Sequence, residues 1–314
     1  MLPVVRATQF IAILALVPAS RAATFAFPAN GDNVIGATEV VRARDNDNFF
    51  ELGIAYDQGY REMQIANPAA DPLLLRTGSA VLVPTQYILP EAPYEGIVIN
   101  VPEMRLYYFP PAKNGKREVV TFPVGIGRQD WMTPKGITHV VAKQKDPAWY
   151  PPESIRIEHA AEGDPLPKVV KAGPDNPLGQ YALRLGLNGY LIHGTNKVYG
   201  IGMRVTHGCM RLYPDDIEHL FAMVPVGTQV RIVNQPFKVG QLGDTVQLEV
   251  HPYLEEDAAA FQAHNLTVMQ LIVNRVKNRA AEVDWERLQR ELQIRSGVPQ
   301  PIGRLLGPKV ASRR

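Results

Sequence analysis

The residues best suited to chemistry lie in one segment, Ile192 to Leu212, which reads IHGTNKVYGIGMRVTHGCMRL. The segment contains Cys209, the only cysteine of the chain, and two of the seven histidines, His193 and His207. A free thiol titrates near ~8.5, so at neutral pH it needs a base to become a nucleophile. We therefore expect Cys209 to act as a nucleophile and His193 to act as its general base.

The same segment can supply the other groups that nucleophilic catalysis requires. A general base needs a third group that holds its ring in one tautomer, and the carbonyl of Gly194 directly follows His193. A developing oxyanion needs backbone N–H donors, and the turn His207-Gly208-Cys209 can direct successive N–H groups at one anion. The pattern predicts a complete cysteine active site.

Three other interpretations of these residues remain open. His193, His207 and Cys209 have the ligand types of a catalytic zinc site, although the short paired spacings typical of zinc ligands are missing. Cys209 is also compatible with an inert buried thiol, but glycines and histidines flank it. A redox sensor would lack a resolving cysteine. We expect no metal and no organic cofactor.

The first 22 residues have the features of a secretory signal peptide. Arg6 provides a positive charge, Phe10–Val17 is a short apolar run, and Ser20-Arg21-Ala22 places small residues where a signal peptidase reads them. The apolar run is shorter than the ~20 residues of a membrane-spanning helix. We expect cleavage after Ala22, a location in the periplasm or cell envelope, and no transmembrane segment.

The composition is that of a globular protein and argues against nucleic-acid binding. The chain has 314 residues, 46% of them hydrophobic, which suits one large domain or two smaller ones. Its 33 Lys and Arg residues nearly balance 31 Asp and Glu residues, so no basic surface is indicated. An exported protein commonly pairs its cysteines, so a lone cysteine suggests a thiol kept for its reactivity.

Short β-strands are predicted on both sides of the reactive segment, within a catalytic domain of residues 95–233. They are rich in β-branched and aromatic residues, which is typical of a β-sandwich or barrel-like fold. They are expected at 96–101, 105–109, 119–124, 136–141, 181–185, 190–192 and 229–233. Two proline-rich loops, 146–152 and 163–179, are expected to frame the substrate site, with Trp149 as either a contact or a core residue.

A small unit with the order strand-helix-helix-strand is predicted at residues 38–84. This order, with Asn67-Pro68 and Leu82-Val83-Pro84, resembles a LysM module, which is a small glycan-binding unit. The head departs from the family pattern, because Arg44-Asp45-Asn46-Asp47 stands where the family has Gly-Asp-Thr. A degenerate module kept for packing is the alternative. Residues 85–95 are predicted to be a linker.

The last part of the chain, residues 234–314, is expected to be a helical extension. Val246–Val250 is the last predicted strand, and a helix is predicted from Asp284 as N-cap to Gly297. The apolar stripe of this helix is typical of a docking face. The fold class as a whole is therefore expected to be mainly β with α additions.

The reactive segment resembles the signature of the L,D-transpeptidases, the YkuD family. The resemblance rests on His193-Gly194 followed by Thr206-His207-Gly208-Cys209-Met210-Arg211-Leu212. The segments VGIG at 124–127, TPKG at 133–136 and GPDNPLG at 173–179 resemble family segments in the same order. Over the whole chain, the order of parts is most similar to the Gram-negative enzymes that attach Braun lipoprotein to peptidoglycan.

The resemblance implies roles for individual residues. Cys209 corresponds to the nucleophile, His193 to the general base and the Gly194 carbonyl to the group that orients the base. The backbone of His207, Gly208 and Cys209 corresponds to the oxyanion hole.

Thr206, Trp149 and Arg211 are expected to contact the substrate. A bond from Arg211 to a stem-peptide carboxylate is one interpretation of this residue, and a structural salt bridge is the other.

The resemblance also implies a reaction on peptidoglycan. The enzyme would take a tetrapeptide stem, release its terminal D-Ala and join the meso-diaminopimelate carbonyl to an amine. The expected amine is the C-terminal lysine of an outer-membrane lipoprotein. A second stem, which gives a 3→3 cross-link, and water, which makes the enzyme an L,D-carboxypeptidase, are the alternatives. A non-catalytic peptidoglycan-binding protein is a more distant one.

Overall fold

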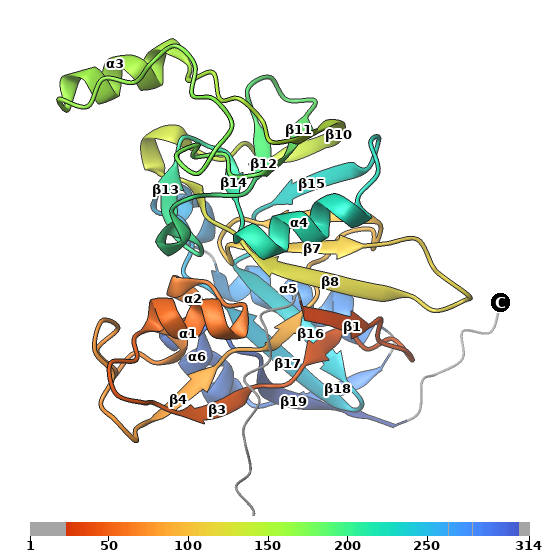
Figure 1. Cartoon of the computed structure of the whole chain (residues 1–314). Coiled ribbons are helices and arrows are strands. Elements are labelled where there is room, and N and C mark those ends of the chain that lie inside the picture. Colours follow the sequence, from red (N-terminus) through yellow and green to blue (C-terminus); the bar gives the residue numbers. More distant parts are fainter. Residues whose placement is uncertain (1–22, 263, 278, 308–314) are drawn as a thin grey trace, which may run out of the picture.

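The computed structural model describes residues 23–262, 264–277 and 279–307, and it shows a mainly β protein with several short helices (Figure 1). The signal peptide predicted at residues 1–22 lies outside the described residues. Within the described ranges, every helix is too short or too polar to cross a membrane.

A curled sheet of nine strands, in the order β1-β8-β7-β6-β15-β10-β11-β12-β14, forms the largest part of the fold (Figure 1). The pairs β6–β15 and β12–β14 are parallel, and the other neighbours are antiparallel. The predicted sandwich or barrel therefore takes the form of one mixed sheet. Its strands are β1 (Ala23–Ala26), β6 (Gly96–Asn100), β7 (Arg105–Phe109), β8 (Glu118–Pro123), β10 (Gly136–Lys145), β11 (Tyr181–Leu185), β12 (Leu191–His193), β14 (Met210–Arg211) and β15 (Gln229–Val233).

The middle of this sheet is buried on both faces, which explains why its strands read as continuous apolar runs. One face forms the main core, where Ile97, Leu106 and Phe122 are fully buried together with Leu220 of helix α4 (Pro214–Met223). The opposite face packs against β2 (Val34–Gly36) and β5 (Gln86–Ile88), which pair with each other. Ile192 of β12 and Met210 of β14 continue the main core to the end of the sheet.

The remaining short elements surround the sheet. They are β9 (Ile126–Gly127), β13 (Arg204–Thr206), α3 (Glu153–Ala161) and the 3-10 helices η1 (Gln129–Trp131), η2 (Val198–Gly200) and η3 (Glu255–Phe261). Strands β9 and β13 pair in parallel beside the main sheet.

The N-terminal unit has four elements in the expected order. They are β3 (Glu39–Arg42), α1 (Phe49–Tyr56), α2 (Tyr60–Ala66) and β4 (Ala80–Val83), and β3 pairs with β4. The Asn48 side chain caps α1 by accepting from two backbone N–H groups, and Phe49 and Met63 fill a small separate core.

The segment 85–95, which the sequence predicted to be a linker, is packed into the fold. It contains β5, and Tyr87, Ile88 and Leu89 are buried against the main sheet and the C-terminal part. Pro90 was the signal for a linker, but three apolar residues before it outweigh that signal by packing.

The C-terminal part is also different from the predicted helical extension. It is a four-stranded sheet in the order β16-β17-β19-β18 with two helices packed on it. Its elements are β16 (Phe237–Leu242), β17 (Thr245–Val250), α5 (His264–Val276), β18 (Ala280–Val283), α6 (Trp285–Ile294) and β19 (Gln300–Leu306). Strands β16, β18 and β19 were missed. The signals for the last two were weak, because β18 is short and β19 contains Pro301 and Gly303, and their pairing with each other and with β17 makes them strands.

Candidate active site

The pairing of β12 with β14 brings the predicted base and nucleophile to one face of the sheet. Ile192 lies opposite Met210, and both are fully buried in the main core. Because side chains alternate along a strand, the residues that flank this pair project from the other face. His193 and Cys209 therefore lie on the same face of adjacent parallel strands, together with Arg211, which lies opposite His193.

The His193 ring is held in one orientation. Its Nδ1 lies 2.6 Å from the carbonyl oxygen of Gly194, so we assign the proton to Nδ1 and the lone pair to Nε2. The side chain is 4% exposed. Burial, and next the Arg211 guanidinium, lower the pKa of His193 to about 3, although the Gly194 carbonyl acts in the opposite direction. The ring is thus a neutral imidazole near pH 7, which is the form that can accept a proton.

The Cys209 thiol is half-buried at the start of β14. Its Sγ lies 3.6 Å from the carbonyl oxygen of Gly189, to which the S–H can donate. Burial raises the pKa of Cys209, while the backbone of Leu191 and the Arg211 guanidinium act to lower it. The free enzyme therefore holds a thiol and a neutral imidazole on the same face of the sheet, rather than a thiolate and an imidazolium.

The turn before Cys209 is held by two threonines. The Thr206 hydroxyl donates to the Cys209 carbonyl at 2.6 Å and accepts from the Gly208 N–H at 3.2 Å. The Thr133 hydroxyl donates to the Gly208 carbonyl at 3.0 Å and accepts from the Gly127 N–H at 2.9 Å. The Gly208 amide, one of the expected oxyanion donors, is thus engaged within the turn.

Gly208 itself is required by the shape of this turn. Its φ of 99° lies in the left-handed region, and a Cβ would come within 2.8 Å of Cε1 of Tyr190. Any side chain here would displace the backbone that positions the adjacent Cys209.

The His207 side chain binds helix α3. Its Nε2 lies 2.9 Å from Oε2 of Glu158, and the Trp131 ring approaches it edge-on with centroids 5.2 Å apart. Glu158 also accepts from Arg128, and this bond and the His207 bond lower the pKa of Glu158. His207 therefore fastens the cysteine turn to the long loop that carries α3.

Arg211 has no carboxylate partner among the described residues, so the structural salt bridge that was its alternative role is not found there. Its guanidinium lies against the backbone of Gly200, and its Nε is buried without a hydrogen-bond partner in the described part of the chain. Burial lowers its pKa, although the side chain stays cationic at neutral pH. An unpaired cation beside the cysteine is suited to bind an anionic group of a substrate.

Trp149 is half-buried in the loop before α3 and lies outside the main core cluster. Its backbone pairs with Val170 of the second long loop, with N–H···O distances of 2.8 and 2.9 Å. The Asn176 amide further joins these loops by donating to the Pro147 carbonyl at 2.8 Å. The two loops therefore form one unit.

Three side chains that are suited to a metal do cluster, but at another place. Among the described residues, ligand atoms of Glu103, Glu249 and His251 lie within 4.8 Å of one another. The Lys238 ammonium already lies 2.9 Å from Glu103 and 2.6 Å from Glu249, so this cluster contains its own cation. His193, His207 and Cys209 form no such cluster there, which leaves the zinc interpretation without geometric support.

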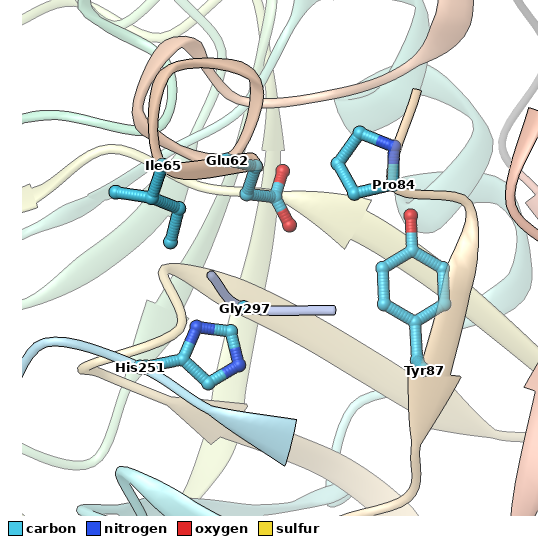
Figure 2. Close-up of a pocket in the computed structure, with 6 residues that line it drawn as sticks. All are labelled: Glu62, Ile65, Pro84, Tyr87, His251 and Gly297. Atoms are coloured by element: carbon cyan, nitrogen blue, oxygen red, sulfur yellow. The ribbon is translucent and has the colours of Figure 1, made fainter. Parts of the chain in front are cut away.

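The small hollow shown in Figure 2 is also separate from the cysteine. It is lined by Glu62, Ile65, Pro84, Tyr87, His251 and Gly297, where the N-terminal unit meets the C-terminal part. A second hollow is lined in part by Gly127, Met132 and Thr133, and it adjoins the cysteine turn through the Thr133–Gly208 bond.

Glu158, Arg128 and Thr133 are site residues that sequence reasoning missed. Glu158 lies 49 positions before His207, and no local pattern links them. Thr133 belongs to the TPKG segment, which was noted only as a resemblance. Its membership of that segment was the one signal available.

Comparison with known proteins gives a consistent result. The family model of the L,D-transpeptidase catalytic domain, YkuD, matches residues 95–232. A probable L,D-transpeptidase of Escherichia coli K12, YcfS, is 40% identical over 301 residues, which cover 94% of this chain and 93% of the relative. Another from the same organism, ErfK/SrfK, is 42% identical over 90% of this chain and 92% of the relative. The NMR structure of the catalytic domain from E. faecium L,D-transpeptidase is 21% identical, covers 46% of this chain and 100% of that one, and has a TM-score of 0.34.

Proposed function

Because the chain belongs to the L,D-transpeptidase (YkuD) family, we propose that it acts on peptidoglycan stem tetrapeptides through a thioester on Cys209. The observation that carries the proposal is the geometry of the β12–β14 pair. It places the thiol and a neutral, oriented imidazole on one face of adjacent strands. Both groups have the protonation states that the first step needs.

In the first step, Sγ of Cys209 attacks the carbonyl carbon of the third stem residue, meso-diaminopimelate. The thiol proton passes to Nε2 of His193 as the C–S bond forms. The pKa values of the two groups disfavour a free thiolate–imidazolium pair, so proton transfer and bond formation are coupled. The C–N bond to D-Ala then breaks, and the His193 proton goes to the leaving amine.

The tetrahedral intermediate requires N–H donors at its oxyanion. The Gly208 amide is engaged by Thr206 in the free enzyme, so we assign the principal donor to the Cys209 amide, supported by the His207 amide. The hydrogen bonds of Thr133 and Thr206 hold this turn in place.

Arg211 binds a carboxylate of the stem peptide in this scheme. Its guanidinium is unpaired, partly desolvated and on the same face as the thiol. A charge-assisted bond in such a place contributes about 1.5–3 kcal/mol. Trp149 and the joined long loops form the wall against which the stem lies.

In the second step, an amine attacks the thioester while His193 acts as base. We propose the C-terminal lysine of an outer-membrane lipoprotein as this amine. This choice rests on the order of parts along the chain. A second stem would give a 3→3 cross-link, and water would give L,D-carboxypeptidase activity.

Intact mass measurement tests the thioester directly. Incubation with purified tetrapeptide is expected to give a covalent adduct with loss of D-Ala, and Cys209→Ala is expected to give none while remaining folded by circular dichroism. An adduct in the Cys209→Ala protein would exclude the mechanism. Product analysis with a lipoprotein C-terminal peptide and a second stem offered together identifies the acceptor.

We propose a periplasmic location and a wall-binding role for the N-terminal unit, based on the predicted signal peptide and the β3-α1-α2-β4 order. Sacculus pull-down of the Cys209→Ala protein tests the second proposal, because binding cannot then depend on a covalent adduct. Deletion of residues 38–84 would remove packing contacts with the rest of the protein. The sacculus-binding test therefore uses the full chain with substitutions at the exposed Leu73 and Leu74.

A further inference from the structure

Strand β1 begins at Ala23, beside a buried carboxyl group. The Ala23 backbone nitrogen lies 3.3 Å from Oδ2 of Asp57. Asp57 is the residue that ends α1, it has a left-handed φ of 54°, and it is 4% exposed. A residue at the edge of the nine-stranded sheet thus reaches the turn between the two helices of the N-terminal unit.

A second buried carboxyl group faces the same place. Asp216, in the first turn of α4, is 1% exposed. Within the described part of the chain, no group outside the pair donates to either oxygen of Asp216 or to Oδ1 of Asp57. The two carboxyl groups share a hydrogen bond, which requires one of them to be protonated, and each changes the pKa of the other. Buried carboxyl oxygens with few donors are costly, so a further donor at this place would stabilise the pair.

Around this pair, carboxyl groups outnumber the cations that contact them. Among the described residues, Arg105 of β7 is a cation that acts on both carboxyl groups, and it already donates to Glu62 through two contacts of 2.7 and 2.9 Å. One guanidinium therefore faces three carboxyl groups, and the exposed Asp215 adds to the negative side. Burial raises the pKa of Asp57 to about 6, and burial together with Asp57 raises the pKa of Asp216 far above its usual range.

We propose that Asp57 and Asp216 form a binding site for the α-ammonium group that is created at Ala23 when residues 1–22 are removed. The proposal rests on cleavage after Ala22, which the small residues Ser20 and Ala22 predict. An amide nitrogen at Ala23 offers one N–H and no charge. An α-ammonium at the same position offers three N–H donors and a positive charge.

Processing would in this way connect three segments that are far apart in the sequence. The new N-terminus lies in β1, Asp57 belongs to the N-terminal unit, and Asp216 lies in the helix that follows the Cys209 strand. The ion pair would form only in the cleaved protein, so the exported form would be held together more firmly than the precursor.

The test compares proteins that differ only at the N-terminus. One begins at Ala23 after removal of a fusion partner, and the other carries Gly-Ser-Gly before Ala23. Each is made with the native side chains, with Asp216→Asn and with Asp215→Asn, which removes the neighbouring exposed charge as a matched control. Thermal unfolding and the acetylation rate of the α-amino group at pH 7 are measured, and mass spectrometry identifies the N-terminus of the exported protein.

We expect the protein that begins at Ala23 to melt roughly 5–10 °C above the extended one. Asp216→Asn should abolish this difference, whereas Asp215→Asn should keep it. The α-amino group should react at least about tenfold more slowly in the native-sequence protein than in the Asp216→Asn variant, because pairing raises its pKa by a unit or more.

Several results would overturn the proposal. Equal melting temperatures of the Ala23 form and the extended form, both with native side chains, would do so. A difference in melting temperature that persists between these two forms in the Asp216→Asn background would also do so, because it would indicate a steric effect of the extension. A mature N-terminus other than Ala23 would also exclude it. If Asp216→Asn does not fold, two measurements still decide the question. One is the difference in melting temperature between the native-sequence forms, and the other is the α-amino acetylation rate relative to Asp215→Asn.

Discussion

Burial around His193 and Cys209 moves both groups toward their neutral forms. The imidazole has a pKa of about 3, and the thiol pKa is raised. Papain-like enzymes activate their cysteine differently, by lowering its pKa through a charged histidine. In the proposed mechanism the base acts at the moment of attack, and this difference can be measured.

The acylation rate should therefore be insensitive to pH near the usual histidine value. A lowered His193 pKa means that protonation blocks the base only as the pH falls toward about 3. We expect kcat/KM for acylation to be flat from about pH 5 to about pH 8. Replacement by His193→Ala should slow acylation by ~10²–10⁴-fold. Stopped-flow acylation at several pH values measures both, and an inflection near ~6.5 would contradict the neutral-pair assignment.

The unpaired guanidinium of Arg211 allows its substrate-binding role to be tested by substitution. If it binds a substrate carboxylate, Arg211→Met should raise KM for the tetrapeptide by about 10–100-fold, which corresponds to a charge-assisted bond of about 1.5–3 kcal/mol. The melting temperature should change little, because no described carboxylate pairs with it. Arg184→Met, which removes an exposed charge from β11, is the control. A fall in melting temperature with unchanged KM would indicate a structural role.

At the scale of the element, helix α3 depends on few apolar contacts. Ile155 is its one residue described as buried, so the bonds of Glu158 to Arg128 and His207 tie the helix to the active-site turn. These pairs are partly exposed, and such pairs contribute little to global stability. Their effect is expected on local order.

Glu158→Gln should therefore loosen residues 146–179 without large change in the melting temperature. Hydrogen exchange of this loop should become faster, and the acylation rate should fall because the cysteine turn loses its contact with α3. Glu153→Gln at the exposed start of the same helix is the matched control. Unchanged exchange in Glu158→Gln would show that the loop is held by the Trp149–Val170 pairing instead.

At the scale of the whole molecule, a buried charge cluster joins the C-terminal sheet to the catalytic part. Lys238 of β16 contacts Glu103 and Glu249, and Glu249 also accepts from His251 at 2.6 Å and from the Ile88 N–H of β5 at 2.6 Å. Burial raises the pKa of Glu103, but the Lys238 ammonium, His251 and the hydrogen bonds from Lys238 and Tyr107 together outweigh it, so the net shift is downward. The cluster therefore stabilises the fold above the unfolded carboxyl pKa and loses this effect as the pH falls through the lower folded value.

Lys238→Met should destabilise the protein by about 3–5 kcal/mol at pH 7, because it leaves two buried carboxylates without their cation. The loss should shrink toward about pH 5, since unpaired buried carboxyl groups then take up protons. Urea unfolding at both pH values measures this, with the exposed Lys116→Met as control. A pH-independent loss would point to lost packing of the lysine stem instead.

Local sequence patterns were enough to predict many of the strands, the fold class and the family resemblance. Runs such as GIVINV and RLYYF predict strands because β-branched and aromatic residues fit a sheet, and β6 and β7 are found there. The mainly β class and the family resemblance followed from residues adjacent in sequence. The linker at 85–95 and the helical extension at 234–314 were wrong, because β5, β18 and β19 are strands only through their partners.

At the site, local pattern was enough to identify residues with the right chemistry, since a lone cysteine with a His-Gly pair and a His-Gly-Cys turn lies within one short segment. The contacts of these residues depend on the packed fold: the His207 ring binds Glu158, the Gly208 amide is engaged within its turn, and Arg211 has no carboxylate partner among the described residues. The packed fold also places Ala23 beside Asp57 and near Asp216. These contacts join segments distant in sequence, and their burial, which sets the pKa values, exists only once the chain has packed.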